Sequence, residues 1–101
     1  MEMTTFTEND KLCIKLSGEI DHHGAREVRT RLDELIMETR PRTLVINLCG
    51  INFMDSSGLG LLLGRYRVIK SLGGEMYLAE PTTRVRQILA MAGVDKMIKM
   101  L

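Results

Sequence analysis

The sequence of 101 residues has no tryptophan, two tyrosines, two phenylalanines, two prolines and two cysteines, and neither sign of charge dominates it. Fourteen Lys and Arg residues against 13 Asp and Glu residues leave a formal net charge of +1. Because phosphate contacts need an excess of basic side chains on one face, this balance argues against a nucleic-acid-binding protein. It also argues against a polybasic membrane-surface module. The scarcity of aromatic rings argues against a base-stacking platform.

Long apolar runs are also missing. None exceeds five residues, far below the roughly 20 needed to cross a bilayer. The first ten residues are polar and contain no signal-peptide segment, so we expect a cytoplasmic chain with no membrane partner. Cys13 and Cys49 lie far apart inside strand-like segments and form no C-x-x-C motif, which favours buried, reduced thiols.

Size and periodicity predict the architecture. The length has room for one hydrophobic core and not for two domains, so residues 1–101 are expected to form a single domain. Changes in hydrophobic period predict the order β-β-α-β-α-β-α-β. This alternation is typical of an α/β fold with a mixed, mostly parallel sheet and helices packed on it. The predicted strands are 3–7, 11–18, 43–48, 75–79 and 96–101, and the predicted helices are 21–40, 57–72 and 81–92.

Details of these elements are also predicted. The strand 43–48 is nearly continuously apolar, which indicates burial on both faces of the sheet, and 50–55 is expected to be a connection. Pro81 is expected at the first position of the third helix. The inward residues predicted for the second helix are Leu59, Leu62, Leu63, Tyr66 and Ile69.

A serine-bearing turn, 54–60, joins the most buried predicted strand to the second helix. In α/β proteins the carboxyl end of a strand feeding a helix is where sites are placed, beside free backbone N–H groups and the positive end of the helix dipole. Either Asp55 or Ser56 caps this helix, or the Ser56 hydroxyl is functional, and the two interpretations are compatible. The turn matches neither the G-x-S-x-G nucleophile motif nor a phosphate-binding glycine loop.

The only two histidines, His22 and His23, are adjacent, so they point about 100° apart on a helix and cannot share a metal as an i, i+4 pair can. Nothing in the sequence places either of them beside Ser56 as a base, which argues against an enzyme. No metal or cofactor is predicted. Glu19 and Asp21 give the preceding helix start an acidic character suited to basic groups of a partner. A lone exposed hydroxyl is better suited to a switch than to a catalyst.

Four segments carry a family resemblance: 53–60 (FMDSSGLG), 16–23 (LSGEIDHH), 63–66 (LGRY) and 73–76 (GGEM). In this order they resemble the STAS-domain anti-anti-sigma factors, also called anti-sigma factor antagonists. The first segment resembles the phosphorylation-site signature of that family. The Asp-His-His and Gly-Arg-Tyr pieces resemble its sporulation branch.

The resemblance implies a function. Unphosphorylated members bind a protein that is both anti-sigma factor and serine kinase, which releases a sporulation sigma factor. Phosphorylation with ATP ends the binding, and a serine phosphatase resets the protein. Carried onto this chain, the phosphoacceptor is Ser56. The residues implied in partner binding are Glu19, Asp21, Asp55, Ser57 and Gly58.

One departure and two alternatives accompany this interpretation. Family members continue into a further helix after the last strand, and here we expect that helix to be absent, which affects stability and any contact it makes. One alternative is another STAS module, such as a stress-signalling scaffold or a transporter-associated domain. The other is a small nucleotide-binding or hydrolytic domain that uses the turn around Ser56; the lack of a P-loop lysine weakens it.

Overall fold

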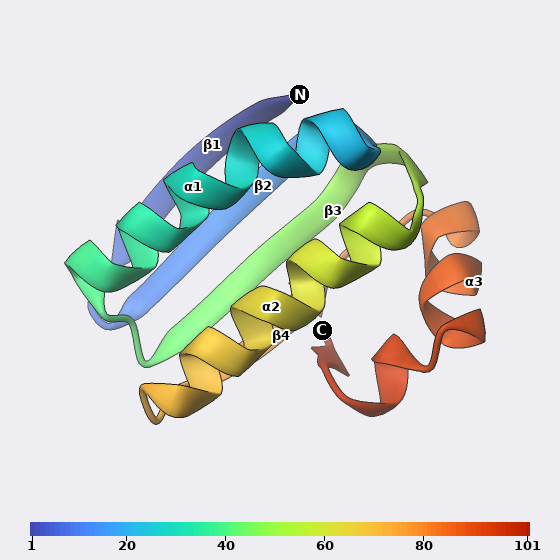
Figure 1. Ribbon diagram of the computed structural model, residues 1–101. Coiled ribbons are helices and arrows are strands. Elements are labelled where there is room, and N and C mark those ends of the chain that lie inside the picture. The colour runs from blue at the N-terminus through green and yellow to red at the C-terminus, as the bar shows by residue number, and fades with distance from the viewer.

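A single five-stranded sheet runs through the computed structural model, which describes all 101 residues (Figure 1). The strands lie in the sheet in sequence order, β1 antiparallel to β2 and every later pair parallel. The predicted α/β class, mixed sheet and element order are therefore confirmed. The elements are β1 (Glu2–Glu8), β2 (Lys11–Ile20), α1 (His22–Thr39), β3 (Thr43–Met54), α2 (Ser56–Ser71), β4 (Glu75–Ala79), α3 (Thr83–Met91), the 3-10 helix η1 (Val94–Lys96) and β5 (Lys99–Met100).

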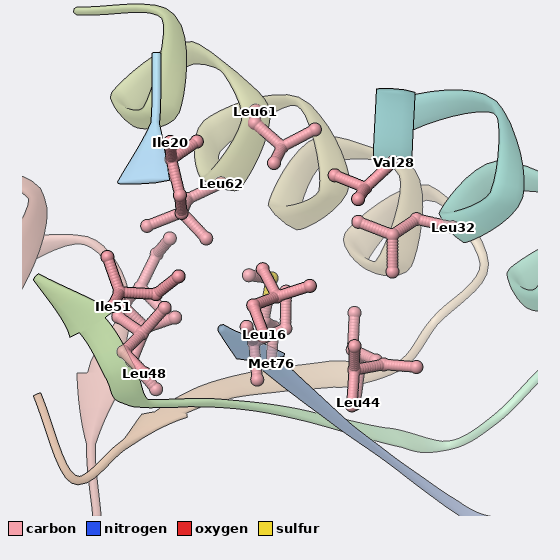
Figure 2. Close-up of a cluster of buried hydrophobic side chains, with 14 of the residues drawn as sticks. Leu16, Ile20, Val28, Leu32, Leu44, Leu48, Ile51, Leu61, Leu62 and Met76 are labelled. Carbon is pink, nitrogen blue, oxygen red and sulfur yellow. The ribbon is translucent and has the colours of Figure 1, made fainter. Parts of the chain in front are cut away.

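The core lies between one face of the sheet and the helices α1 and α2, which run side by side over it (Figure 1). Alternate residues of β2, β3 and β4 stand in register on this face, because side chains alternate along a strand. Figure 2 shows the same cluster, with apolar side chains of α1 and α2 packed against those of the strands. The labelled side chains are Leu16, Ile20, Val28, Leu32, Leu44, Leu48, Ile51, Leu61, Leu62 and Met76.

The opposite face of the sheet is less covered than predicted. Val45 is buried there, but Thr43 and Asn47 are only half-buried, so the prediction that strand 43–48 is buried on both faces holds only in part. The reason is that α1 and α2 both cover the same side of the sheet. Both cysteines are free, Cys13 half-buried and Cys49 exposed, so the prediction of two buried thiols is wrong.

Several element boundaries differ from the prediction. Residues 50–54 are strand rather than connection, because they pair with the end of β2 after two register shifts. Of the last predicted strand, 96–101, only Lys99–Met100 are strand and pair with β4, whereas Lys96 ends η1 and the next two residues form a turn. Pro81 precedes α3 instead of opening it, since the Thr82 hydroxyl accepts a hydrogen bond from the Val85 N–H and caps the helix. No helix is long and apolar enough to cross a membrane.

Candidate functional site

The starts of α1 and α2 lie next to each other at one edge of the sheet. This follows from the parallel pairing of β2 with β3, which continues to the last residue of each strand, Ile20 opposite Met54. The Asp55 N–H extends the pairing by donating to the Ile20 carbonyl at 3.2 Å. Two helix N-termini, each with free N–H groups and a positive dipole end, therefore share this edge.

An aspartate caps each of these helices. Asp55 accepts a hydrogen bond from the Ser57 N–H at 2.8 Å, and Asp21 accepts one from the Gly24 N–H at 2.8 Å. The bond from Gly24 lowers the pKa of Asp21 below its ordinary value, because it stabilises the carboxylate form. Of the two capping residues left open by the sequence, the structure thus selects Asp55 for α2.

Ser56 is left free by this arrangement. It is the first residue of α2, it is exposed, and its hydroxyl has no hydrogen-bond partner in the chain. Ser57 is half-buried, with its N–H held by Asp55. The predicted start of the helix at Ser57 is one residue late. Of the two neighbouring serines, Ser56 is the more accessible to a partner.

Gly58 sets how closely the start of α2 approaches the sheet. It is buried, and a Cβ atom at this position would overlap Cγ of Met54 and lie 2.9 Å from Cγ2 of Ile20. Both neighbours are core residues, with exposed fractions of 2% and 0%. The structure thus gives Gly58 a packing role that positions the turn at Ser56, rather than a place on the exposed surface.

The predicted acidic residues lie close to Ser56 in the fold but around a separate depression. We call this depression the acidic hollow. It lies beside the start of α1 and is lined by Glu19, Asp21 and Glu27. Glu19 is exposed and stands opposite Phe53 in the pairing of β2 with β3. The pairing of β2 with β3 therefore brings Glu19 and Asp21 to the same edge of the sheet as Asp55.

The two histidines diverge, as expected from their spacing. His23 points along α1, with its Nε2 3.8 Å from Oε1 of Glu27. His22 instead lines a groove together with Ser57, although no hydrogen bond joins it to Ser56 or Ser57. No cluster of three or more His, Cys, Asp or Glu side chains has metal-binding geometry.

This groove, which the sequence did not indicate, runs between α1 and α2 with a volume of about 590 Å³. Four arginines line it and give it a strong positive charge. We call this depression the arginine groove; its arginines are Arg26, Arg29, Arg65 and Arg67. Gly60 and Gly64, one turn apart on α2, lie in its wall, and a Cβ at either would meet nothing within 4 Å. The glycine pair at i, i+4 was the signal that could have indicated an open channel here.

Arg65 is the buried member of the groove, with 5% of its surface exposed. Its Nε lies 2.9 Å from Oδ1 of Asp33 on α1, although the two atoms are not aligned as a hydrogen bond. Burial lowers the pKa of Arg65, an effect that Asp33 opposes and the nearby Arg29 reinforces. The prediction for the inward face of α2 is confirmed for Leu62 and Ile69, which are buried, and not for the others. Leu59, Leu63 and Tyr66 are half-buried, and Leu61 and Arg65 are buried in their place.

The fold and the serine turn place the chain in a known class. The family model for the STAS domain matches residues 2–101, and the chain belongs to this family. A protein of Paenibacillus polymyxa named anti-sigma F factor antagonist is 42% identical over 87 residues, 86% of this chain and 74% of that protein. One of the same name from Lysinibacillus sphaericus is 35% identical over 94 residues, 93% of this chain and 78% of its own.

Solved structures agree with this assignment. The anti-sigma factor antagonist SpoIIAA in its unphosphorylated form superposes with a TM-score of 0.85 at 29% identity, covering 99% of this chain and 88% of that one. The phosphorylated form of the Bacillus cell fate determinant SpoIIAA gives a TM-score of 0.76 at 28% identity, covering 99% and 91%. The resemblance recognised in the sequence is thereby confirmed.

Proposed function

We propose that this chain is a phosphorylation-regulated anti-sigma factor antagonist of the cytoplasm. Its unphosphorylated form binds an anti-sigma factor that is also a serine kinase and thereby releases a sporulation sigma factor. Phosphorylation of Ser56 ends the binding, and a serine phosphatase restores it. Support comes from relatives named anti-sigma F factor antagonists and from the similarity to SpoIIAA, which is described in phosphorylated and unphosphorylated forms. The chain acts as substrate and ligand in this scheme, not as an enzyme.

The observation that carries the proposal is the free hydroxyl of Ser56 at the first position of α2. A kinase must reach the acceptor oxygen, and Ser56 is exposed while Asp55 does the capping. Ser57 is half-buried in the first turn and its N–H is already bonded, so it is the poorer acceptor. The cap therefore leaves the adjacent serine available for modification.

The same position explains why phosphorylation would act on binding and not on the fold. A phosphate adds about −1.5 to −2 charges at neutral pH, and the N-terminus of a helix accepts an anion readily. In a protein interface the same dianion loses water and meets nearby carboxylates, Glu19, Asp21 and Asp55, which disfavours the contact. We expect the phosphorylated chain to keep its backbone structure and to lose its partner.

The test is phosphorylation in vitro by an anti-sigma F factor with ATP, followed by mapping of the phosphate by mass spectrometry. We expect the wild-type chain and Ser57→Ala to be phosphorylated on Ser56. Ser56→Ala should bind the anti-sigma factor and remain unmodified. Phosphate on Ser57 in the Ser56→Ala variant would refute the choice of acceptor. If the wild-type chain neither binds nor is modified, the chain belongs instead with scaffold or transporter-associated STAS modules.

A further inference from the structure

The arginine groove has more positive charge than the chain neutralises. Asp33 is the one carboxylate within 4.0 Å of any of its four arginines, and it contacts Arg65. Arg26, Arg29 and Arg67 are exposed and have no ion-pair partner. With a net charge of only +1 for the whole chain, this concentration of like charge on one face is unfavourable unless an anion offsets it.

Arg65 supplies a second, independent observation. Its side chain is 6% exposed and lines the groove, and its buried Nη1 has no hydrogen-bond acceptor in the chain. Leaving a buried charged donor without an acceptor is costly, and guanidinium groups bind carboxylates through two parallel bonds. The single misaligned contact with Asp33 leaves this capacity unused. An oxyanion bound in the groove would offset the positive charge that the chain itself leaves there.

The shape of the groove favours an extended acidic segment of a protein. Small-molecule pockets are mostly apolar and enclosed. Here only two of ten lining residues are hydrophobic. The α2 side of the groove extends from Ser57 to Arg67, which is about 15 Å at 1.5 Å per residue. That length accommodates about four or five residues of an extended peptide.

We propose that the arginine groove binds an acidic segment of the same partner that contacts Ser56, with Arg65 as its buried anchor. This inference rests on the proposed function, because the groove begins at Ser57, one residue from the phosphoacceptor. The acidic hollow lies on the other side of the start of α1, where Glu27 lies 3.7 Å from the N-terminal ammonium and Glu19 and Asp21 have no basic partner within the chain. The surface that this chain presents to its partner thus has a positively charged part and a negatively charged part, and this arrangement fixes the orientation of the complex.

The first test uses hexaglutamate as the probe and follows the 15N-labelled full chain by NMR. We expect saturable shifts of the Arg65 Nε–Hε signal and of the Gly60 and Gly64 amides, weakening with added salt. The double variant Arg29→Ala/Arg67→Ala should bind the peptide about tenfold more weakly, since each exposed charge pair contributes up to about fivefold.

The matched control removes two exposed arginines outside the groove, Arg31 on α1 and Arg86 on α3, and leaves the same net charge. Arg31→Ala/Arg86→Ala should bind hexaglutamate within about twofold of the wild-type chain. An equal loss in both double variants, or shifts spread over the whole surface, would overturn the proposal. So would inorganic phosphate saturating the same signals at lower concentration, because the site would then be one for phosphate.

The second test separates this inference from the function on which it rests. Binding of an anti-sigma F factor should be at least tenfold weaker for Arg29→Ala/Arg67→Ala than for the control double variant. If the factor binds both variants equally and still phosphorylates Ser56, the groove proposal is wrong and the proposed function stands. If the factor does not bind the wild-type chain, the proposed function fails, and the hexaglutamate result shows separately whether the groove binds acidic segments.

Discussion

Replacement of Gly58 by alanine should destabilise the fold, although alanine is the better helix former. The new methyl group would overlap Met54 and crowd Ile20, two core residues that have no free space to move into. Overpacking of this kind costs about 1–3 kcal/mol. The gain in helix propensity returns about 0.5–1 kcal/mol. We therefore expect a net loss of about 1 kcal/mol in the free energy of unfolding, with about 2.5 kcal/mol as the upper limit.

Gly60→Ala is the matched control, because Gly60 lies in the same helix and its new methyl group would meet nothing within 4 Å. It should stabilise the chain by about 0.5–1 kcal/mol. The difference between the two variants then isolates the packing cost at Gly58, since the propensity gain is common to both. Urea denaturation followed by circular dichroism measures both free energies, provided that the slope m is unchanged.

We also expect the crowding at Gly58 to displace the neighbouring turn at Ser56. If α2 shifts outward to make room, Ser56 moves with it, and phosphorylation by an anti-sigma F factor should slow in Gly58→Ala and not in Gly60→Ala. A Gly58→Ala variant as stable as Gly60→Ala would refute the argument from close packing. The start of α2 would then be held by its cap alone.

Three further predictions concern charges. Ser56→Asp should keep the free energy of unfolding within about 1 kcal/mol of wild type, because a negative charge at a helix start is tolerated or favourable, and should lose the anti-sigma factor in a pull-down. Asp33→Asn leaves Arg65 without its carboxylate and should cost about 1–3 kcal/mol by urea denaturation; adding Arg65→Met should recover part of that loss. The pKa of Asp21 is lowered in the fold, so its contribution to stability is present above its ordinary value of 3.8 and is lost as pH falls through the lower folded value. The stability difference between wild type and Asp21→Asn should therefore shrink below that pH, and a constant difference would contradict the cap.

The sequence predicted an element correctly where hydrophobic periodicity and capping residues within that element determine its structure. The hairpin, the three helices and the strand 75–79 follow from alternation, from Asp21 and from Gly73 and Gly93 at helix ends. The half of β3 after Leu48 could not be predicted this way. Its strand conformation comes from pairing with residues 17–20 of β2, and partners more than 30 residues away leave no trace in a local window.

The candidate site shows the same division. Ser56 and Asp55 were found because strand-to-helix turns have a recognisable composition and because the turn matches a family signature. The arginine groove was missed because its arginines come from two helices and are joined only when α1 packs beside α2. Arg65 was hidden further, since a charged residue is assigned to the outer face of a helix unless its partner is known. That partner, Asp33, lies 32 residues earlier in the chain.

The distribution of charge, rather than its total, governs what one phosphate can do here. A net charge of +1 gives the chain no strong overall field. The acidic hollow and the arginine groove nevertheless lie on two sides of the start of α1 with opposite signs, and the groove begins at Ser57, next to Ser56. A phosphate on Ser56 would add negative charge beside the groove, where it would repel a partner's acidic segment and interact with the groove arginines in its place. The contact would be weakened, while the helix start would stabilise the phosphate itself. A single modification can therefore oppose an extended interface without unfolding the domain that presents it.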